Sequence, residues 1–243
     1  MGKVRFLEWG CLLALAVVGT ICFLHRNVKN ETLPEPLPPT EAAGPLAGLR
    51  VCLDAGHGGY DGGAYGRDSG TPEKELNLDV ARRLADLLSA DGAEVVMTRT
   101  EDTALADEGE NRKRRDLQRR VDCAAGADLF LSIHMNEYRT RSESGPQVFY
   151  RKGQGDSRLL AGALQERLNA DLVPDRPRSA NTGDYYLLRN LDIPAVLVEC
   201  GFLSNAAEEQ KLLTPAYRQA VAQSLRDGIL AYLALAQTRA GGV

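Results

Sequence analysis

Three short runs of β-branched and apolar residues each lead to a side chain that can bind a metal ion. The runs cover residues 49–53, 128–133 and 194–198. They lead to His57, His134 and Glu199. Short apolar runs of this kind are typical of buried strands, and an open α/β sheet builds its active site along the carboxyl ends of its strands. We therefore expect the three side chains to lie just past strand ends, at one edge of a sheet.

The remaining pattern alternates helix and strand. Apolar residues three and four positions apart predict helices over 75–90, 117–125, 159–168 and 214–233, and further strands are predicted at 94–98 and 147–150. Thr214 followed by Pro215 is a typical helix start, and we expect 147–150 to be a hairpin-like strand. This alternation predicts a single α/β catalytic domain, in which helices cover both faces of a mostly parallel, twisted sheet.

The amino-terminal residues 1–26 predict a signal-anchor that spans a membrane. Lys3 and Arg5 precede an almost wholly apolar stretch, 6–24, which has close to the roughly 20 residues needed to cross a bilayer. A cleaved secretory signal is the alternative, although no small-x-small cleavage site follows Leu24. Either reading predicts that the rest of the chain is exported.

Residues 27–48 contain five prolines, a composition that favours an extended tether. The catalytic domain is predicted at 49–236 and a short tail at 237–243. We expect the domain to be held on the outer face of the cytoplasmic membrane.

Charge and cysteine usage exclude some classes of protein. A formal net charge of -4 gives no reason to expect nucleic acid as a partner, and the basic run 112–115 is predicted to be a solvated helix face. The five cysteines form no Cys-x-x-Cys pair and no disulfide framework. We expect Cys52 and Cys200 to be small buried side chains beside the predicted strands.

Zinc hydrolases commonly use three ligands drawn from histidine and carboxylate, and a separate carboxylate takes a proton from water. His57 and His134 are candidates for two of the ligands. Segment 70–78 supplies a third, because Glu73 and Glu75 both stand where the first helix is predicted to begin. The glycine-rich stretch before this helix is long enough to wrap such a site.

Four motifs in this order resemble those of the zinc-dependent N-acetylmuramoyl-L-alanine amidase family. They are Asp54-Ala-Gly-His57-Gly-Gly59, Glu73-Lys74 with Leu76-Asn77-Leu78, Ala127 to Asn136, and Val198 to Asn205. The resemblance covers about residues 49–236, and four ordered motifs are far more specific than any one of them.

The resemblance implies that one zinc ion is bound by His57, Glu73 and His134, and that Glu199 is the catalytic carboxylate. It selects Glu73 over Glu75, because the family's ligand directly precedes a lysine. The implied reaction is hydrolysis of the amide between N-acetylmuramic acid and L-alanine in peptidoglycan.

Within the family, the chain looks most like the germination-specific amidase of endospore formers, which trims spore-cortex peptidoglycan. This likeness implies a location on the forespore or cortex side. Segments 98–102, 111–120 and 145–150 carry this likeness. Cys200 and Cys123 depart from the family's usual residues, which puts local packing in doubt rather than the reaction.

Three other polar residues receive candidate roles. Arg189 is either a surface arginine or a group that holds a stem-peptide carboxylate or the oxyanion. Asn136 either contacts substrate or caps a loop. Arg120 is expected to pair with Glu199 or with Asp54, in a structural role.

Alternatives from other classes stay open on these residues. One is a catalytically silent peptidoglycan-binding protein on the same fold, and another is a cysteine hydrolase that uses Cys200 with His134. A lipoprotein partner that activates the enzyme is also left open.

Overall fold

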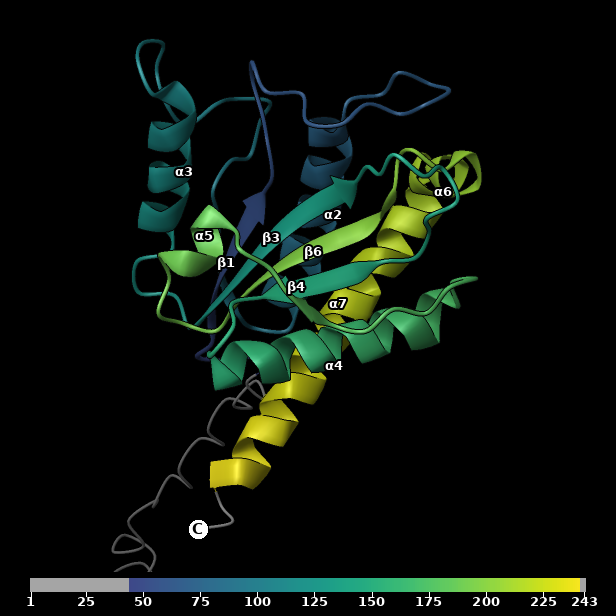
Figure 1. The fold of residues 1–243 in the computed structure, drawn as a ribbon. Helices are drawn as coiled ribbons and strands as arrows, with labels where there is room; N and C mark the ends of the chain where they lie inside the picture. Colours follow the sequence, from purple (N-terminus) through teal and green to yellow (C-terminus); the bar gives the residue numbers. More distant parts are fainter. Residues whose placement is uncertain (1–43, 241–243) are drawn as a thin grey trace, which may run out of the picture. The chain divides into compact units, whose positions relative to one another are not determined.

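The structure is a computed structural model that describes residues 44–240, and it confirms the predicted α/β class (Figure 1). The elements along the chain are β1 (Arg50–Ala55), α2 (Glu73–Ala90), β2 (Glu94–Met97), α3 (Arg112–Cys123), β3 (Leu129–Asn136), β4 (Gln147–Tyr150), α4 (Gly155–Leu172), β5 (Asn181–Thr182), α5 (Tyr186–Arg189), β6 (Ala195–Phe202), α6 (Ala206–Leu212) and α7 (Pro215–Ala240).

The six strands form one sheet in the order β2-β1-β3-β6-β4-β5. Strands β2, β1, β3 and β6 are parallel, β4 is antiparallel to β6, and β5 is parallel to β4. The predicted strand 147–150 forms, but the expectation of a hairpin is wrong. Strand β6, which comes later in the chain, lies between β3 and β4 and pairs with both.

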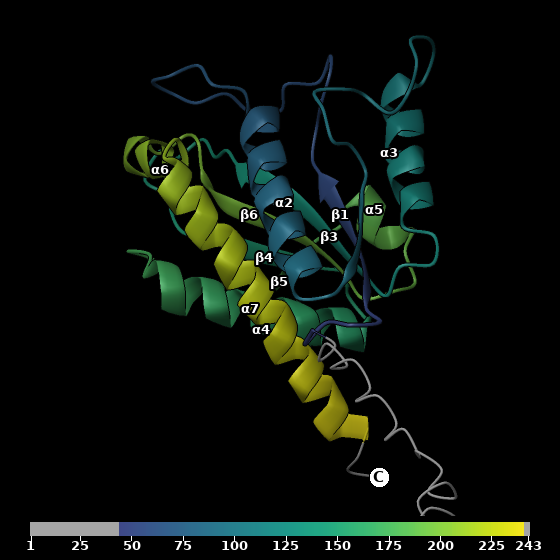
Figure 2. The same cartoon turned by 180° about the vertical axis from the view of Figure 1, so that it is seen from behind.

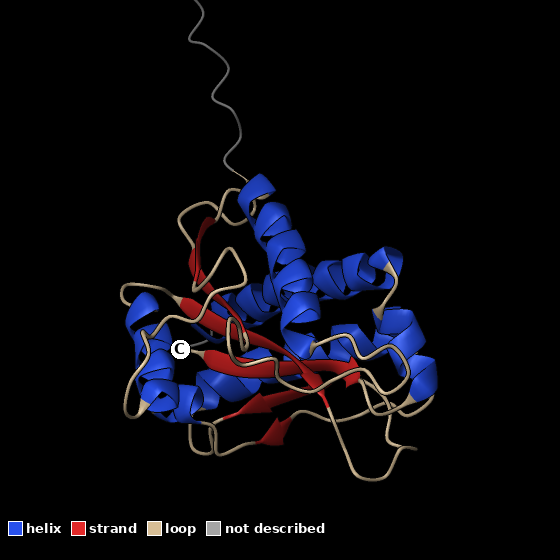
Figure 3. Ribbon diagram, turned by 90° about the horizontal axis from the view of Figure 1, so that it is seen from above, coloured by secondary structure: helices blue, strands red, loops and turns tan. Residues whose placement is uncertain are grey.

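Helices cover both faces of the sheet, as predicted (Figure 3). Helices α2, α4 and α7 pack together on one face, which Figure 2 shows from behind, and α3 and α5 contact each other on the other face. Alternate residues of β1 belong to the two apolar cores, since Val51 and Leu53 are in the larger core and Cys52 is in the smaller one.

Helix starts and domain ends differ from the predicted positions. Helix α3 begins at Arg112, five residues before the predicted start at 117, because its first turn is charged and has no apolar periodicity. Leu46 is buried in the larger core, so the compact part of the chain includes residues assigned to the tether. Helix α7 continues to Ala240, beyond the predicted domain end at 236.

Among residues 44–240, the structure contains no helix that is both long and apolar enough to cross a bilayer. The predicted signal-anchor, 1–26, and most of the predicted tether lie outside the described residues.

The two site residues on central strands lie inside those strands rather than past their ends. Strand β3 extends through His134 to Asn136, and β6 extends through Glu199 to Phe202. The apolar runs stop earlier, but β3 and β6 continue to pair, with His134 opposite Glu199 and an irregular register after it. Tertiary pairing therefore lengthens both strands beyond the part that hydrophobicity marks.

Candidate metal centre

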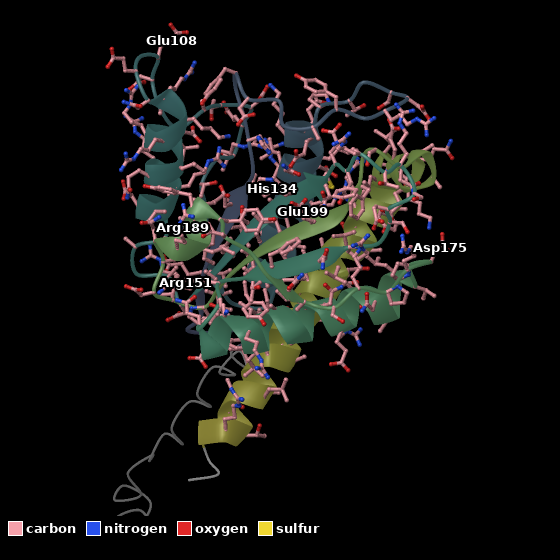
Figure 4. The ribbon with its side chains drawn as sticks, viewed as in Figure 1. Glu108, His134, Arg151, Asp175, Arg189 and Glu199 are labelled. Carbon is pink, nitrogen blue, oxygen red and sulfur yellow. The ribbon has the colours of Figure 1, made fainter. Side chains whose placement is uncertain are left out.

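The structure brings His57, Glu73 and His134 together at the carboxyl edge of the sheet. Each offers one ligand atom, and these atoms all lie within 4.8 Å of one another. His57 follows β1, Glu73 is the first residue of α2, and His134 is in β3, where Figure 4 labels it. Glu75, the other candidate carboxylate, is exposed.

Glu73 is the buried centre of this cluster, with 3% of its surface exposed. Its Oε1 accepts hydrogen bonds from Asn77 Nδ2 (3.0 Å) and Met135 N (3.1 Å), and its Oε2 accepts one from Ala64 N (2.8 Å). His134 Nδ1 lies 2.9 Å from Oε1, and the Nε2 of the other histidine lies 3.3 Å from Oε2. Burial works to raise the pKa of Glu73, but the two histidines outweigh it and lower that pKa.

A second carboxylate faces His57 from the glycine-rich loop. Asp61 Oδ1 lies 2.9 Å from His57 Nδ1, and its other oxygen pairs with Lys113 of α3. Although burial works to lower it, the pKa of His57 is raised to about 9, through its contacts with Asp61 and Glu73. The negative potential at the cluster therefore favours a cation.

Two glycines leave the space that the cluster needs. A Cβ atom at Gly56 would lie 2.4 Å from His134 Nε2, and one at Gly63 would lie 2.4 Å from Glu73 Oε2. Real Cβ atoms do not approach side chains so closely, so any larger residue would displace a candidate ligand.

His57 has a left-handed backbone, with a φ of 61°. This conformation costs a non-glycine residue on the order of 1–2 kcal/mol, and such strain clusters at functional sites. Arg120 holds the turn, because its Nη2 donates to the His57 carbonyl oxygen at 2.7 Å.

Glu199 lies on β6 directly opposite His134, and Figure 4 shows the two labelled residues close together. Its Oε2 is buried and has no hydrogen-bond partner among the described residues. Burial, assisted by the charge of Glu73, raises the pKa of Glu199 to about 7. A carboxyl group with this pKa can both accept and release a proton near neutral pH.

The two candidate substrate contacts have different surroundings. Asn136 lines a cavity of about 400 Å³ beside the cluster. Arg189 is exposed at the end of α5, pairs with Asp184 at 2.7 Å, and lines a separate hollow with Arg151 (Figure 4). The structure does not bring Arg189 to the cluster.

Cys200 is fully buried in the larger apolar core, as predicted, while the preceding side chain, Glu199, faces the cluster. Burial raises the pKa of the Cys200 thiol far above its usual value, so the thiolate is strongly disfavoured. Its burial and its raised pKa both count against the cysteine-hydrolase alternative.

Arg120 pairs with Asp54 at 2.6 Å, which confirms one of its two predicted partners. Sequence reasoning gave no role to Asp61 or Asn77. Both stand within four residues of a candidate ligand, which is the signal that could have found them.

The fold and the cluster together define an α/β protein with a centre of two imidazoles and a carboxylate at the sheet's carboxyl edge, an arrangement typical of metal-dependent hydrolases. Residues 51–231 match the Amidase_3 family, described as N-acetylmuramoyl-L-alanine amidase, and the chain belongs to this family.

Individual relatives agree with this assignment. The chain is 40% identical over 194 residues to the germination-specific N-acetylmuramoyl-L-alanine amidase of Bacillus subtilis (strain 168), covering 77% of this chain and 81% of that one. The CwlD amidase from Clostridioides difficile, solved in complex with the GerS lipoprotein, has a TM-score of 0.74 at 35% identity, covering 77% and 99% of the two chains. An N-acetylmuramoyl-L-alanine amidase from Clostridium difficile 630 has a TM-score of 0.70 at 34% identity, covering 77% and 97%. The predicted enzyme class, an amidase acting on peptidoglycan, is confirmed.

Proposed function

We propose that this amidase is zinc-dependent, with His57, Glu73 and His134 as the metal ligands and Glu199 as the group that moves the proton. The observation that carries the proposal is the convergence of three donor atoms within 4.8 Å, opposite a carboxyl group with an unpaired buried oxygen. The bond cleaved is the amide between N-acetylmuramic acid and L-alanine of the stem peptide.

Two imidazole nitrogens and one carboxylate oxygen form a donor set that suits zinc and leaves a position for water or substrate. When bound there, zinc would polarise the amide carbonyl and make a water molecule acidic enough to ionise near neutral pH. The Asp61 carboxylate would fix the orientation of the His57 ring, and Asn77 would fix the Glu73 carboxylate.

Glu199 would take the proton of the attacking water on Oε2 and deliver it to the departing nitrogen of L-alanine. General acid–base catalysis of this kind contributes about 10²–10⁴-fold to the rate. Burial beside the two histidines keeps this oxygen within the site and away from bulk water.

The setting is also proposed. We infer a role in spore-cortex maturation from the germination-specific relative and an exported, cell-wall location from the reaction itself. The predicted signal-anchor at 1–26 would hold the enzyme on the membrane's outer face. The complex of CwlD with the GerS lipoprotein supports a lipoprotein as an activating partner of this chain too.

Metal dependence is tested by assaying the full chain on muropeptides before chelation, after chelation, and after zinc is restored. We expect the released peptide to begin with L-alanine, and we expect activity to disappear and return with one zinc ion per chain. Glu73→Gln should lose both zinc and activity, whereas the matched control Glu75→Gln, an exposed glutamate two residues away, should keep both. Hydrolysis that survives both chelation and Glu73→Gln would overturn the proposal.

A further inference from the structure

The cavity of about 400 Å³ that contains Asn136 lies on the β4 side of the candidate metal centre. Its lining combines polar and aromatic side chains from distant parts of the chain. They include Asn136, Glu143, Gln147, Phe149, Arg178 and Phe202. Of these residues, only Asn136 was predicted from the sequence to contact substrate.

The sheet places this cavity in line with the reacting centre. Glu199 is directly opposite His134 across β3 and β6, and directly opposite Gln147 across β6 and β4. Figure 1 shows these three strands side by side. Opposite residues on neighbouring strands project from the same face, so the three side chains form one row.

The length of this row matches a short peptide. Two strand spacings place the backbones of His134 and Gln147 about 10 Å apart, which is about three residues of extended peptide at roughly 3.3 Å each. A substrate whose scissile amide lies at the metal centre would therefore reach the cavity with the second or third residue of its stem peptide.

Arg178 is a charged hydrogen-bond donor in the cavity, and not all of its N–H groups are used. It donates to Ser144 O (2.7 Å), to the Glu143 carboxylate (2.6 Å) and, weakly, to Gln147 Oε1 (3.4 Å). A guanidinium has five N–H groups, so two remain for a ligand when partners among residues 44–240 are counted.

The surroundings of Arg178 keep its guanidinium in place without neutralising it fully. The group lies over the ring of Phe202, 4.7 Å from the centroid, and 19% of the side chain is exposed. Glu143 shares its charge between Arg178 and Arg176, which lies 3.3 Å away. A fixed, partly desolvated cation of this kind suits a carboxylate ligand.

We propose that this cavity binds the stem peptide, and that Arg178 pairs with the free carboxylate of the residue after L-alanine, a glutamate linked through its side-chain carboxyl group. The inference rests on the proposed function, because that function places the scissile amide at the metal centre. An uncharged glycan would have no use for the ionic pair, which favours the peptide as the occupant.

Two substrates that differ in one group test the proposal with the full chain. They are N-acetylmuramoyl-L-alanyl-D-glutamate with its side-chain carboxyl capped as the methylamide, and the corresponding isoglutamine derivative, in which the α-carboxylate is an amide as well. We expect the native enzyme to prefer the acid by about ten- to a hundredfold in kcat/KM, the factor that a hydrogen bond to a charged group contributes. In Arg178→Gln this preference should fall to within about threefold, mainly because kcat/KM for the acid falls.

Arg151→Gln is the matched control, because Arg151 is a partly exposed arginine that lines a different hollow. The preference of this variant for the acid should be unchanged. Arg178→Lys retains the charge but not the planar fork, so an intermediate preference is expected. Thermal unfolding of each variant separates loss of the fold from loss of recognition. If folded Arg178→Gln enzyme lost kcat/KM for both substrates to the same extent, the proposal would be overturned.

Equilibrium binding of the product dipeptides, with free and amidated glutamate, gives a readout that does not require catalysis. Arg178-dependent discrimination between the dipeptides would support the cavity assignment even if the native chain hydrolysed neither substrate, a result that would count against the proposed function alone. Conversely, amide hydrolysis with no discrimination would overturn only the cavity assignment. If the effect of Arg178→Gln depended on the length of the glycan and not on the carboxylate, the cavity would bind the glycan. The proposal of a peptide occupant would then be overturned.

Discussion

Two neighbouring groups of buried charged side chains in this protein differ in how completely their polar atoms are paired. The metal-centre cluster consists of His57, Glu73, His134 and Glu199. The ion network consists of Asp54, Thr98, Asp116, Arg120 and Ser132. They are adjacent, because Arg120 donates to the carbonyl oxygen of His57.

The charged side chains of the ion network are paired with partners inside the network. Asp54 Oδ1 accepts from Thr98 and Arg120, its Oδ2 accepts from Ser132, and Arg120 also donates to Asp116. Burial works to raise the pKa of Asp54, but Arg120 and the two hydroxyl groups outweigh it and lower the pKa.

The metal-centre cluster is open. Glu199 Oε2 is buried without a hydrogen-bond partner among the described residues, and burial raises rather than lowers the pKa of Glu199. The comparison teaches that buried charge alone does not mark a functional site. What marks it is unused bonding capacity directed at one point, because an unpaired buried polar group costs stability that only a ligand can recover.

The largest effect that would test this difference is expected from zinc removal. Chelation should abolish activity and lower the free energy of unfolding by about 3–4 kcal/mol relative to protein held at 100–1,000 times the dissociation constant in zinc. Calorimetry with a metal assay measures both. If added zinc leaves the unfolding temperature unchanged, the cluster has no bonding capacity left for a metal ion. It would then not differ from the ion network in the way described.

Glu199→Gln should affect the rate and leave the stability intact. We expect kcat to fall about 10²–10⁴-fold, because the proton carrier is lost, while zinc content and unfolding are preserved. Steady-state kinetics and denaturant unfolding of the same preparation check this. Loss of zinc together with activity would instead identify Glu199 as a ligand.

Arg120→Leu should mainly lower the free energy of unfolding. It leaves Asp54 and Asp116 buried without their cation, and breaking a buried pair in this way costs about 3–5 kcal/mol. Zinc should not restore that loss. The control is Arg167→Leu, which removes two partly exposed ion pairs, with Asp171 four residues along α4 and with Asp227 of α7, and should cost about 1 kcal/mol or less. Equal losses in the two variants would contradict a structural role for the network.

Thr98→Val removes one hydroxyl from the Asp54 carboxylate and should cost about 1.5–3 kcal/mol at neutral pH. The pKa of Asp54 is lowered in the folded protein, so its stabilisation is complete above the ordinary aspartate pKa of about 3.9 and is lost as pH falls through the folded value. The cost of Thr98→Val should therefore shrink in acid, since the lost bond favoured the ionised carboxylate. Urea unfolding from pH 7 to pH 3 measures it, and a cost independent of pH would remove Asp54 from the explanation.

Cys200→Ala should have the smallest effect, a loss of about 1–2 kcal/mol with most activity retained. The thiol lies in the larger apolar core. Complete inactivation of folded, zinc-loaded protein would show that this core residue takes part in the chemistry after all.

Local sequence predicted most of the fold and the membership of the metal-centre cluster. Strands such as β1 were predictable because apolar runs report burial directly, and α7 because Thr214 caps its first turn, accepting from Tyr217 N at 3.3 Å. His57, Glu73 and His134 were predictable because each stands within an ordered motif beside such an element.

Only the tertiary structure decided the features that depend on contacts between distant segments. Strand β6 separates β4 from β3 through pairing that no local pattern encodes, and this pairing aligns Gln147 with Glu199 and places the Arg178 cavity beside the metal centre. Arg189 and Arg178 both precede β6, yet they line different hollows, and only the folded structure shows which of them lies in the cavity beside Gln147. Composition and periodicity report which side chains are buried, whereas the direction of a long charged side chain is set by partners far along the chain.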